Sequence, residues 1–105
     1  MTPEIDIETF AARREAGEAV LDVREPDEYA EAHVPGAVLV PLGQLLDRID
    51  EVPEGPLLVI CRSGARSLKA ADQLNSRGYA ATNVAGGTMA WIDSGREVVQ
   101  GMERG

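Results

Sequence analysis

The stretch PLLVICRSGARS, residues 56–67, decides the fold of this chain. Its residues 57–60 are wholly apolar, which predicts a short strand buried on both faces of a parallel sheet. Small and apolar side chains recur every three positions from Ala65 onward, and they predict a helix that runs to about Arg77. Cys61 therefore lies where a buried strand ends and a helix begins, the position at which open α/β sheets bind ligands.

Short apolar runs alternate with helix-like stretches along the rest of the chain. Strands are predicted at 19–23, 37–40 and 82–84. Helices are predicted from Ile7 to Gly17, from Pro26 to about Ala32 and from Thr88 to Ser94, and the spacing of apolar residues predicts another at 42–49. Because parallel strands need crossover connections and helices supply them, we expect an α/β fold with a small, mostly parallel β-sheet flanked by helices on both faces.

The length and composition fit one domain. With 105 residues, of which 44% are hydrophobic, we expect a single domain over 1–105, with its core at about 5–99 and a flexible tail at 100–105. The chain has one cysteine and one histidine, so an intramolecular disulfide is impossible and a metal centre is not expected. The lone cysteine favours a reducing compartment, and no basic start followed by an apolar run opens the sequence. We therefore expect a cytoplasmic location.

The net charge of −8 limits the partners that the chain can bind. An acidic surface repels the phosphates of nucleic acids and of anionic membranes, so we expect neither as a partner. No apolar run approaches the roughly 18 residues that a membrane-spanning helix needs. An anionic substrate would need a local positive site that acts against the charge of the whole protein.

Cys61 and the loop that follows it form the candidate site. The first N–H groups of a helix have no partner inside the helix, and together with nearby arginines they favour a thiolate over a thiol. The glycine of the loop permits a backbone conformation with positive φ, and Ser63 and Ser67 can add hydroxyl donors. Two other interpretations remain, because a buried cysteine can be purely structural and a similar loop can hold phosphate. The expected substrate-binding residues are Arg62, Ser63, Gly64, Ala65 and Arg66.

Four segments, in order and in spacing, resemble the signatures of the rhodanese homology domain in its single-domain form. They are LDVREPDEY at 21–29, AHVPGA at 32–37, CRSGAR at 61–66 and VAGGTMAW at 84–91. Each segment alone is a modest signal, but four in register are specific. The resemblance covers about 5–99 and implies a rhodanese-like fold, which agrees with the apolar pattern.

The resemblance implies a sulfurtransferase of the thiosulfate sulfurtransferase, or rhodanese, type that needs no cofactor. Cys61 would take sulfane sulfur from a donor such as thiosulfate or a low-molecular-weight persulfide, hold it as a persulfide and pass it to a thiol or cyanide. A thioredoxin-like or sulfur-relay protein is a further candidate partner. A sulfur-carrier or regulatory interaction module for a partner protein remains the alternative. The six-residue loop argues against a phosphatase, whose loop in this fold family is one residue longer.

Five residues outside the loop have more than one interpretation. His33 is expected to hydrogen-bond backbone groups in its turn rather than act as a base. Asp22 and Arg24 either support the loop of Cys61 or stabilise only the fold. Ala32 replaces a glycine that the family usually has, which predicts strain if this position needs a positive φ. Glu28 stands near a position where some thiosulfate-specialised relatives carry arginine, which weakens the case for thiosulfate as the donor.

Overall fold

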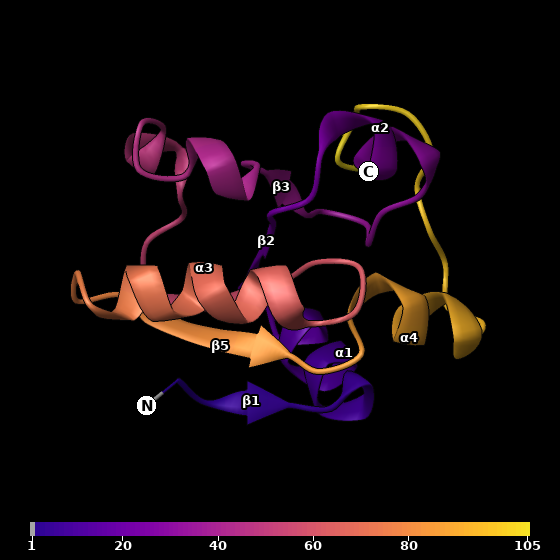
Figure 1. Ribbon diagram of the computed structural model, residues 1–105. Helices are drawn as coiled ribbons and strands as arrows, with labels where there is room; N and C mark the ends of the chain where they lie inside the picture. The colour runs from indigo at the N-terminus through magenta and orange to yellow at the C-terminus, as the bar shows by residue number, and fades with distance from the viewer. Residues whose placement is uncertain (1) are drawn as a thin grey trace.

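The computed structural model describes residues 2–105, and its five strands form one sheet in which every neighbouring pair is parallel. Figure 1 shows helix α3 lying along strand β5. The strand order is β1-β5-β4-β2-β3. The strands are β1 (Glu4–Ile5), β2 (Ala19–Asp22), β3 (Val38–Leu39), β4 (Pro56–Ile60) and β5 (Ala80–Val84). The helices are α1 (Ile7–Glu15), α2 (Pro26–Glu31), α3 (Ala65–Asn75) and α4 (Gly87–Asp93). The predicted α/β fold is confirmed. Within the described residues, no helix has the length and apolar character that crossing a membrane requires.

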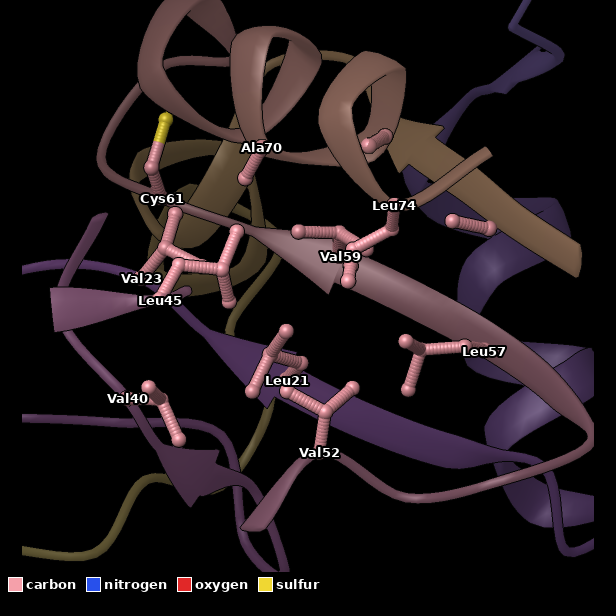
Figure 2. Close-up of a cluster of buried hydrophobic side chains, with 12 residues drawn as sticks. Leu21, Val23, Val40, Leu45, Val52, Leu57, Val59, Cys61, Ala70 and Leu74 are labelled. Atoms are coloured by element: carbon pink, nitrogen blue, oxygen red, sulfur yellow. The ribbon is translucent and has the colours of Figure 1, made fainter. Parts of the chain in front are cut away.

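The central strand β4 is buried on both faces, as its apolar run predicts. Leu57 and Val59 point into an apolar cluster that α3 covers, and Figure 2 shows Leu74 of α3 close to Val59. Leu58 and Ile60 point into a second cluster on the opposite face, where α1, α2 and α4 each contribute an aromatic side chain. The two clusters hold β4 rigidly in the centre of the sheet, so the residue that follows it has a fixed position.

The segment 42–51 differs from the predicted helix. It contains two short 3₁₀ helices, η1 (Leu42–Gln44) and η2 (Ile49–Glu51). A glycine inside η1 lowers helical stability by about 1 kcal/mol relative to alanine. Leu42, Leu45 and Ile49 all pack against the cluster that α3 covers, whereas Leu46 is 48% exposed, so the apolar spacing is used for burial without a regular α-helix.

The sheet has an edge strand that the apolar pattern did not predict. β1 is two residues long, and it pairs Glu4 with Asn83 and Ile5 with Val84 of β5. A strand of this length has no detectable periodicity. β3 is shorter than predicted, and β5 begins earlier, at Ala80.

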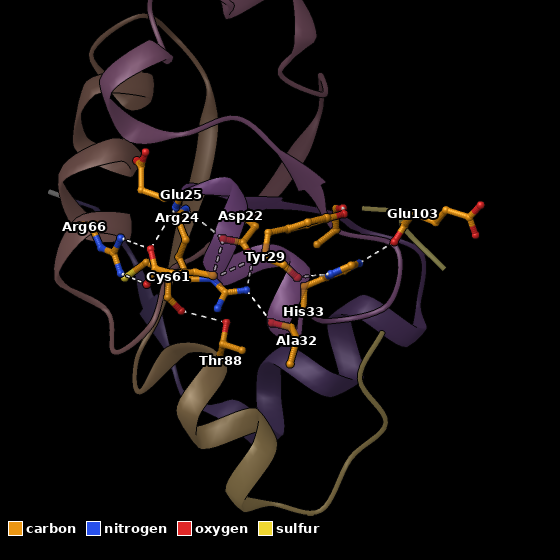
Figure 3. A network of polar contacts seen from close by, with 12 residues as sticks. Asp22, Arg24, Glu25, Tyr29, Ala32, His33, Cys61, Arg66, Thr88 and Glu103 are labelled. Atoms are coloured by element: carbon orange, nitrogen blue, oxygen red, sulfur yellow. Dashed lines mark hydrogen bonds and ion pairs between the residues drawn. The ribbon is translucent and has the colours of Figure 1, made fainter. Parts of the chain in front are cut away.

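His33 has the structural role that the sequence predicted. It is fully buried, and its Nδ1 and Nε2 each lie 2.8 Å from a backbone carbonyl oxygen, of Tyr29 and Glu103 respectively (Figure 3). Its ring also stacks on that of Tyr29, with the centroids 3.6 Å apart. Because both ring nitrogens are engaged, His33 is not available as a base for Cys61.

The C-terminal segment returns past α4 to lie beside α2 (Figure 1). The N–H of Gly101 donates to the carbonyl of Ala30 at 2.7 Å, and the N–H of Gly36 donates to the carbonyl of Arg104 at 2.7 Å. The side chains of 100–105 are exposed. Flexibility of this tail remains a prediction.

Gly87 lets the start of α4 approach the loop after β4. The N–H of Thr88 donates to the carbonyl of Cys61 at 2.8 Å, and that of Met89 donates to the carbonyl of Arg62 at 3.1 Å. Gly87 has a left-handed φ of +57°, and a Cβ there would lie 2.5 Å from the carbonyl oxygen of Cys61 and 2.6 Å from that of Arg62. Only glycine therefore fits between α4 and the loop.

We predict that Leu58→Ala lowers the free energy of unfolding by about 2–5 kcal/mol, since it leaves a cavity at a fully buried position. Urea denaturation followed by circular dichroism measures this change. The matched control is Leu46→Ala at a half-exposed position, for which we expect a change within about 0.5 kcal/mol. Equal losses in the two variants would contradict the assignment of Leu58 to the core.

We predict that Gly87→Ala both destabilises the protein and slows alkylation of Cys61 by iodoacetamide, because the new Cβ displaces the loop. Gly17→Ala is the matched control, since Gly17 has a φ of +103° but a Cβ added to it would meet no atom within 4 Å. Gly17→Ala should cost about 1–2 kcal/mol of backbone strain and leave the alkylation rate unchanged. If Gly87→Ala also leaves that rate unchanged, α4 does not determine the shape of the loop.

Candidate active site

Cys61 follows β4 directly, at the carboxyl end of the sheet, and its Sγ points toward the first turn of α3 (Figure 2). The N–H of Gly64 donates to Sγ at 3.1 Å, and the Ser67 hydroxyl lies 3.3 Å from Sγ. The residue as a whole is only 1% exposed. Burial opposes a negative charge on this sulfur, whereas the hydrogen-bond donors around it favour one.

Gly64 makes this arrangement possible. It caps the N-terminus of α3 with a left-handed φ of +117°, which turns its own N–H toward the sulfur. It also lies against β5, where a Cβ would be 3.6 Å from the carbonyl oxygen of Val84 and 3.6 Å from the nitrogen of Gly86. The positive φ expected at this position is confirmed.

The loop lowers the pKa of the Cys61 thiol below its ordinary value. Burial alone raises that pKa, but hydrogen bonds from the Ser67 hydroxyl and from the N–H groups of Ser67, Gly64 and Ser63 lower it by more. The main cause is thus hydrogen bonding to the thiolate, whereas the sequence had also suggested the positive charge of the arginines.

Arg66 is occupied by an acidic partner from α2. Its guanidinium donates to both carboxylate oxygens of Glu28, at 2.7 and 2.9 Å. Hydrogen bonding to Arg66 holds the pKa of Glu28 at about 2, far below its usual 4.5. The pair therefore stays ionised at neutral pH, and it connects the first turn of α3 to α2.

Asp22 and Arg24 form a buried pair beside the loop. The Arg24 guanidinium donates to the Asp22 carboxylate at 2.8 Å and to the carbonyl of Ala32, also at 2.8 Å (Figure 3). Asp22 is paired in register with Ile60, so the pair lies next to the strand that leads into Cys61. Ala32 has an extended backbone with φ of −170°, and the strain considered for this position does not arise.

A cleft of about 330 Å³ opens beside the loop. Of the loop residues predicted to bind substrate, Arg62 is the one that lines this cleft. Arg62, Ser63 and Ala65 are all exposed. Within residues 2–105, neither Arg62 nor Glu31, which also lines the cleft, has an ion-pair partner. The full lining is Arg24, Glu28, Glu31, Ala32, Arg62, Thr88, Met89 and Ile92.

Two residues of the site were not identified from the sequence. The hydroxyl of Thr88 donates to the carbonyl of Cys61 at 3.0 Å, and the side chain of Asn83 accepts from Ser67 at 2.6 Å. Both are buried and lie on segments far from Cys61 in the chain. Asn83 is a polar residue inside a buried strand, and such a residue must find hydrogen-bond partners; this is the signal that could have found it.

Comparison with known proteins agrees with this geometry. Residues 6–94 match the family described as the Rhodanese-like domain. The chain is 39% identical over 103 residues to a sulfurtransferase of Allochromatium vinosum, a match that covers 94% of this chain and 96% of that protein. It is 40% identical over 93 residues to YrkF of Bacillus subtilis, a candidate sulfur carrier protein by its name, and covers 85% of this chain but 50% of YrkF.

A crystal structure gives the same result at the level of the fold. The rhodanese-related protein of Thermoplasma volcanium superimposes with a TM-score of 0.86 at 30% sequence identity, covering 92% of this chain and 97% of that one. The family match spans most of the chain and includes the whole Cys61 loop. The chain therefore belongs to the rhodanese-like domain family.

Proposed function

We propose that this protein is a sulfurtransferase of the rhodanese type that carries sulfane sulfur as a persulfide on Cys61. The proposal rests on the hydrogen bonds that converge on Sγ and lower the pKa of the thiol. These bonds favour the thiolate over the thiol, so the proposed nucleophile does not require a general base. We propose Cys61 as the catalytic residue and the loop Arg62–Arg66 as the substrate-binding segment.

The reaction proceeds by two displacements at sulfur. The Cys61 thiolate attacks the sulfane sulfur of thiosulfate or of a low-molecular-weight persulfide; the S–S bond of the donor breaks, and sulfite or a thiolate leaves with the electron pair. A thiolate or cyanide then attacks the outer sulfur of the persulfide, and Cys61 leaves as a thiolate. The N–H groups of the loop stabilise negative charge on sulfur in both steps, as an oxyanion hole does for oxygen. The cysteine itself carries the transferred atom, so this reaction uses no cofactor.

The charges at the site favour a donor other than the thiosulfate dianion. Glu28 neutralises Arg66, and Asp22 neutralises Arg24. The remaining cleft charges are one positive, on Arg62, and one negative, on Glu31. A persulfide that carries an ammonium group as well as carboxylates can match both of these charges, whereas the compact thiosulfate dianion has no positive group to set against Glu31.

A partner protein is the second candidate for the acceptor. The cleft has two exposed apolar side chains, Met89 at 44% and Ile92 at 47% exposure, next to the loop. A thioredoxin-like or sulfur-relay protein could cover such side chains while its thiol attacks the persulfide. In that case the protein acts as a sulfur carrier, and the single cysteine is consistent with a reducing, cytoplasmic location.

We predict that wild type gains one sulfur atom by intact mass after treatment with thiosulfate or with glutathione persulfide, and that cyanide or a thiol removes it. Loading should be faster with glutathione persulfide. Cys61→Ser is the matched control and should gain nothing. If wild type stays unmodified with both donors while iodoacetamide still alkylates Cys61, the proposed activity is wrong.

We predict that Glu28→Gln lowers the KM for thiosulfate by roughly 3–10-fold, because one negative charge is removed a few ångströms from a dianion. Steady-state kinetics with cyanide as acceptor measures this change. Glu54→Gln is the matched control: it removes the same charge from the loop before β4, at the opposite end of that strand from Cys61. Equal KM values in wild type and both variants would show that Glu28 does not affect the choice of donor.

A further inference from the structure

A buried hydrogen-bond chain links Cys61 to a side chain on another strand. Ser67, in the first turn of α3, has its hydroxyl oxygen 3.3 Å from Sγ of Cys61 and 2.6 Å from Oδ1 of Asn83. Both Ser67 and Asn83 are fully buried. Asn83 lies on β5 and does not contact the sulfur directly, so it acts on Cys61 through its two neighbours in the site, Ser67 and Gly64. Only the route through Ser67 is lost when the serine hydroxyl is removed.

The orientation of the Asn83 amide is fixed by its other contacts. Its Nδ2 donates to the carboxylate of Glu4 at 2.7 Å and to the carbonyl of Gly64 at 3.2 Å. Carboxylate and carbonyl oxygens only accept hydrogen bonds, so the amide nitrogen must face them. Oδ1 is therefore the atom that faces Ser67, and it can only accept.

The Ser67 hydroxyl has one hydrogen for two acceptors. While Cys61 is a thiol, its S–H can donate to the oxygen of Ser67, and Ser67 donates to Asn83; every group then has a partner. When Cys61 loses its proton, the thiolate and Oδ1 of Asn83 compete for the same hydrogen. Donating to the thiolate leaves a buried amide oxygen without its donor, which is unfavourable.

We propose that the Ser67 hydroxyl is a two-position donor that turns to Cys61 when the sulfur is ionised and to Asn83 when it is not, and that Asn83 is a positioning residue that limits the stability of the thiolate. Ser67 stabilises the ionised form, and Asn83 draws the same donor away from it. The balance between them sets the reactivity of Cys61, because a thiolate that is too stable is a weaker nucleophile.

The two positions match the two states of the sulfur-transfer cycle, a link that rests on the proposed function. In the persulfide the negative charge lies on the outer sulfur, so Ser67 can return to Asn83. When the acceptor attacks the outer sulfur, the S–S bond breaks and its electron pair stays on Sγ. Ser67 then turns to Cys61 and stabilises the leaving thiolate.

The test is the pH dependence of Cys61 alkylation by iodoacetamide, which reports the thiol pKa and requires no sulfur transfer. Ser67→Ala should raise this pKa by about one unit, the usual effect of losing a hydrogen bond to a charged group. Asn83→Leu, similar in size but without an acceptor, should lower it by about half a unit and speed alkylation about twofold below the pKa, since the larger thiolate fraction is partly offset by weaker nucleophilicity. In the double variant the effect of Asn83→Leu should disappear.

Asn75→Leu is the matched control for lost stability. Asn75 also joins α3 to β5, by bonds to the backbone of Ala81, but it does not touch Ser67 or Cys61. It should lower the free energy of unfolding and leave the thiol pKa unchanged. If Asn83→Leu does not fold, Asn83→Ala replaces it with the same expected direction. A raised Cys61 pKa in Asn83→Leu, or the same pKa shift from Asn83→Leu with and without the Ser67 hydroxyl, would overturn the proposal. If these pKa shifts are found but Cys61 does not load sulfur, the proposed function is refuted instead.

Discussion

The hydrogen bonds that converge on the buried sulfur of Cys61 are the interaction on which the rest of the site depends. The protein carries a net charge of −8, so its overall field opposes an anion, and burial opposes it further. Hydrogen bonds at the start of α3 supply the compensation, and they require the left-handed turn at Gly64. The two apolar clusters hold β4 in place, and α4 holds the loop from the other side through the contacts at Gly87. Each of these features keeps backbone N–H groups directed at one sulfur atom.

Two arginines of the site, Arg24 and Arg66, hold neighbouring segments in position and add little net positive charge. Arg66 is paired with Glu28 and Arg24 with Asp22, so each guanidinium positions a neighbouring segment: Arg66 connects α3 to α2, and Arg24 holds the end of α2 through Ala32. Loss of either carboxylate would leave a cation without its partner, which is costlier for the buried pair than for the half-exposed one. The hydrogen bonds to Sγ therefore lower the thiol pKa of a small acidic protein without a large positive patch. Under the proposed function, the few charges that remain at the cleft would select among donors.

The sequence predicted the parts of this molecule that depend on local patterns. The run 57–60 identified the central strand, the following glycine and helix start located Cys61, and four signature segments identified the family. The prediction was less successful where tertiary contacts determine the local structure. Residues 42–51 form two 3₁₀ helices and not one helix, and the missed strand β1 is held by pairing with β5. Thr88, which binds the carbonyl of Cys61, and Asn83, which binds Ser67, were missed for the same reason. Strand order β1-β5-β4-β2-β3 brings β5 and the loop together, and no local spacing encodes that neighbourhood.

The most direct measurement of the central claim is a crystal structure of the protein after treatment with a sulfur donor. We expect a second sulfur bonded to Sγ of Cys61 and lying within hydrogen-bond distance of the N–H groups of 62–67. We also expect the Ser67 hydroxyl to lie closest to Asn83 in that state. A persulfide that points away from the loop, with those N–H groups bound to water, would contradict the view that the loop is built to stabilise the anionic sulfur.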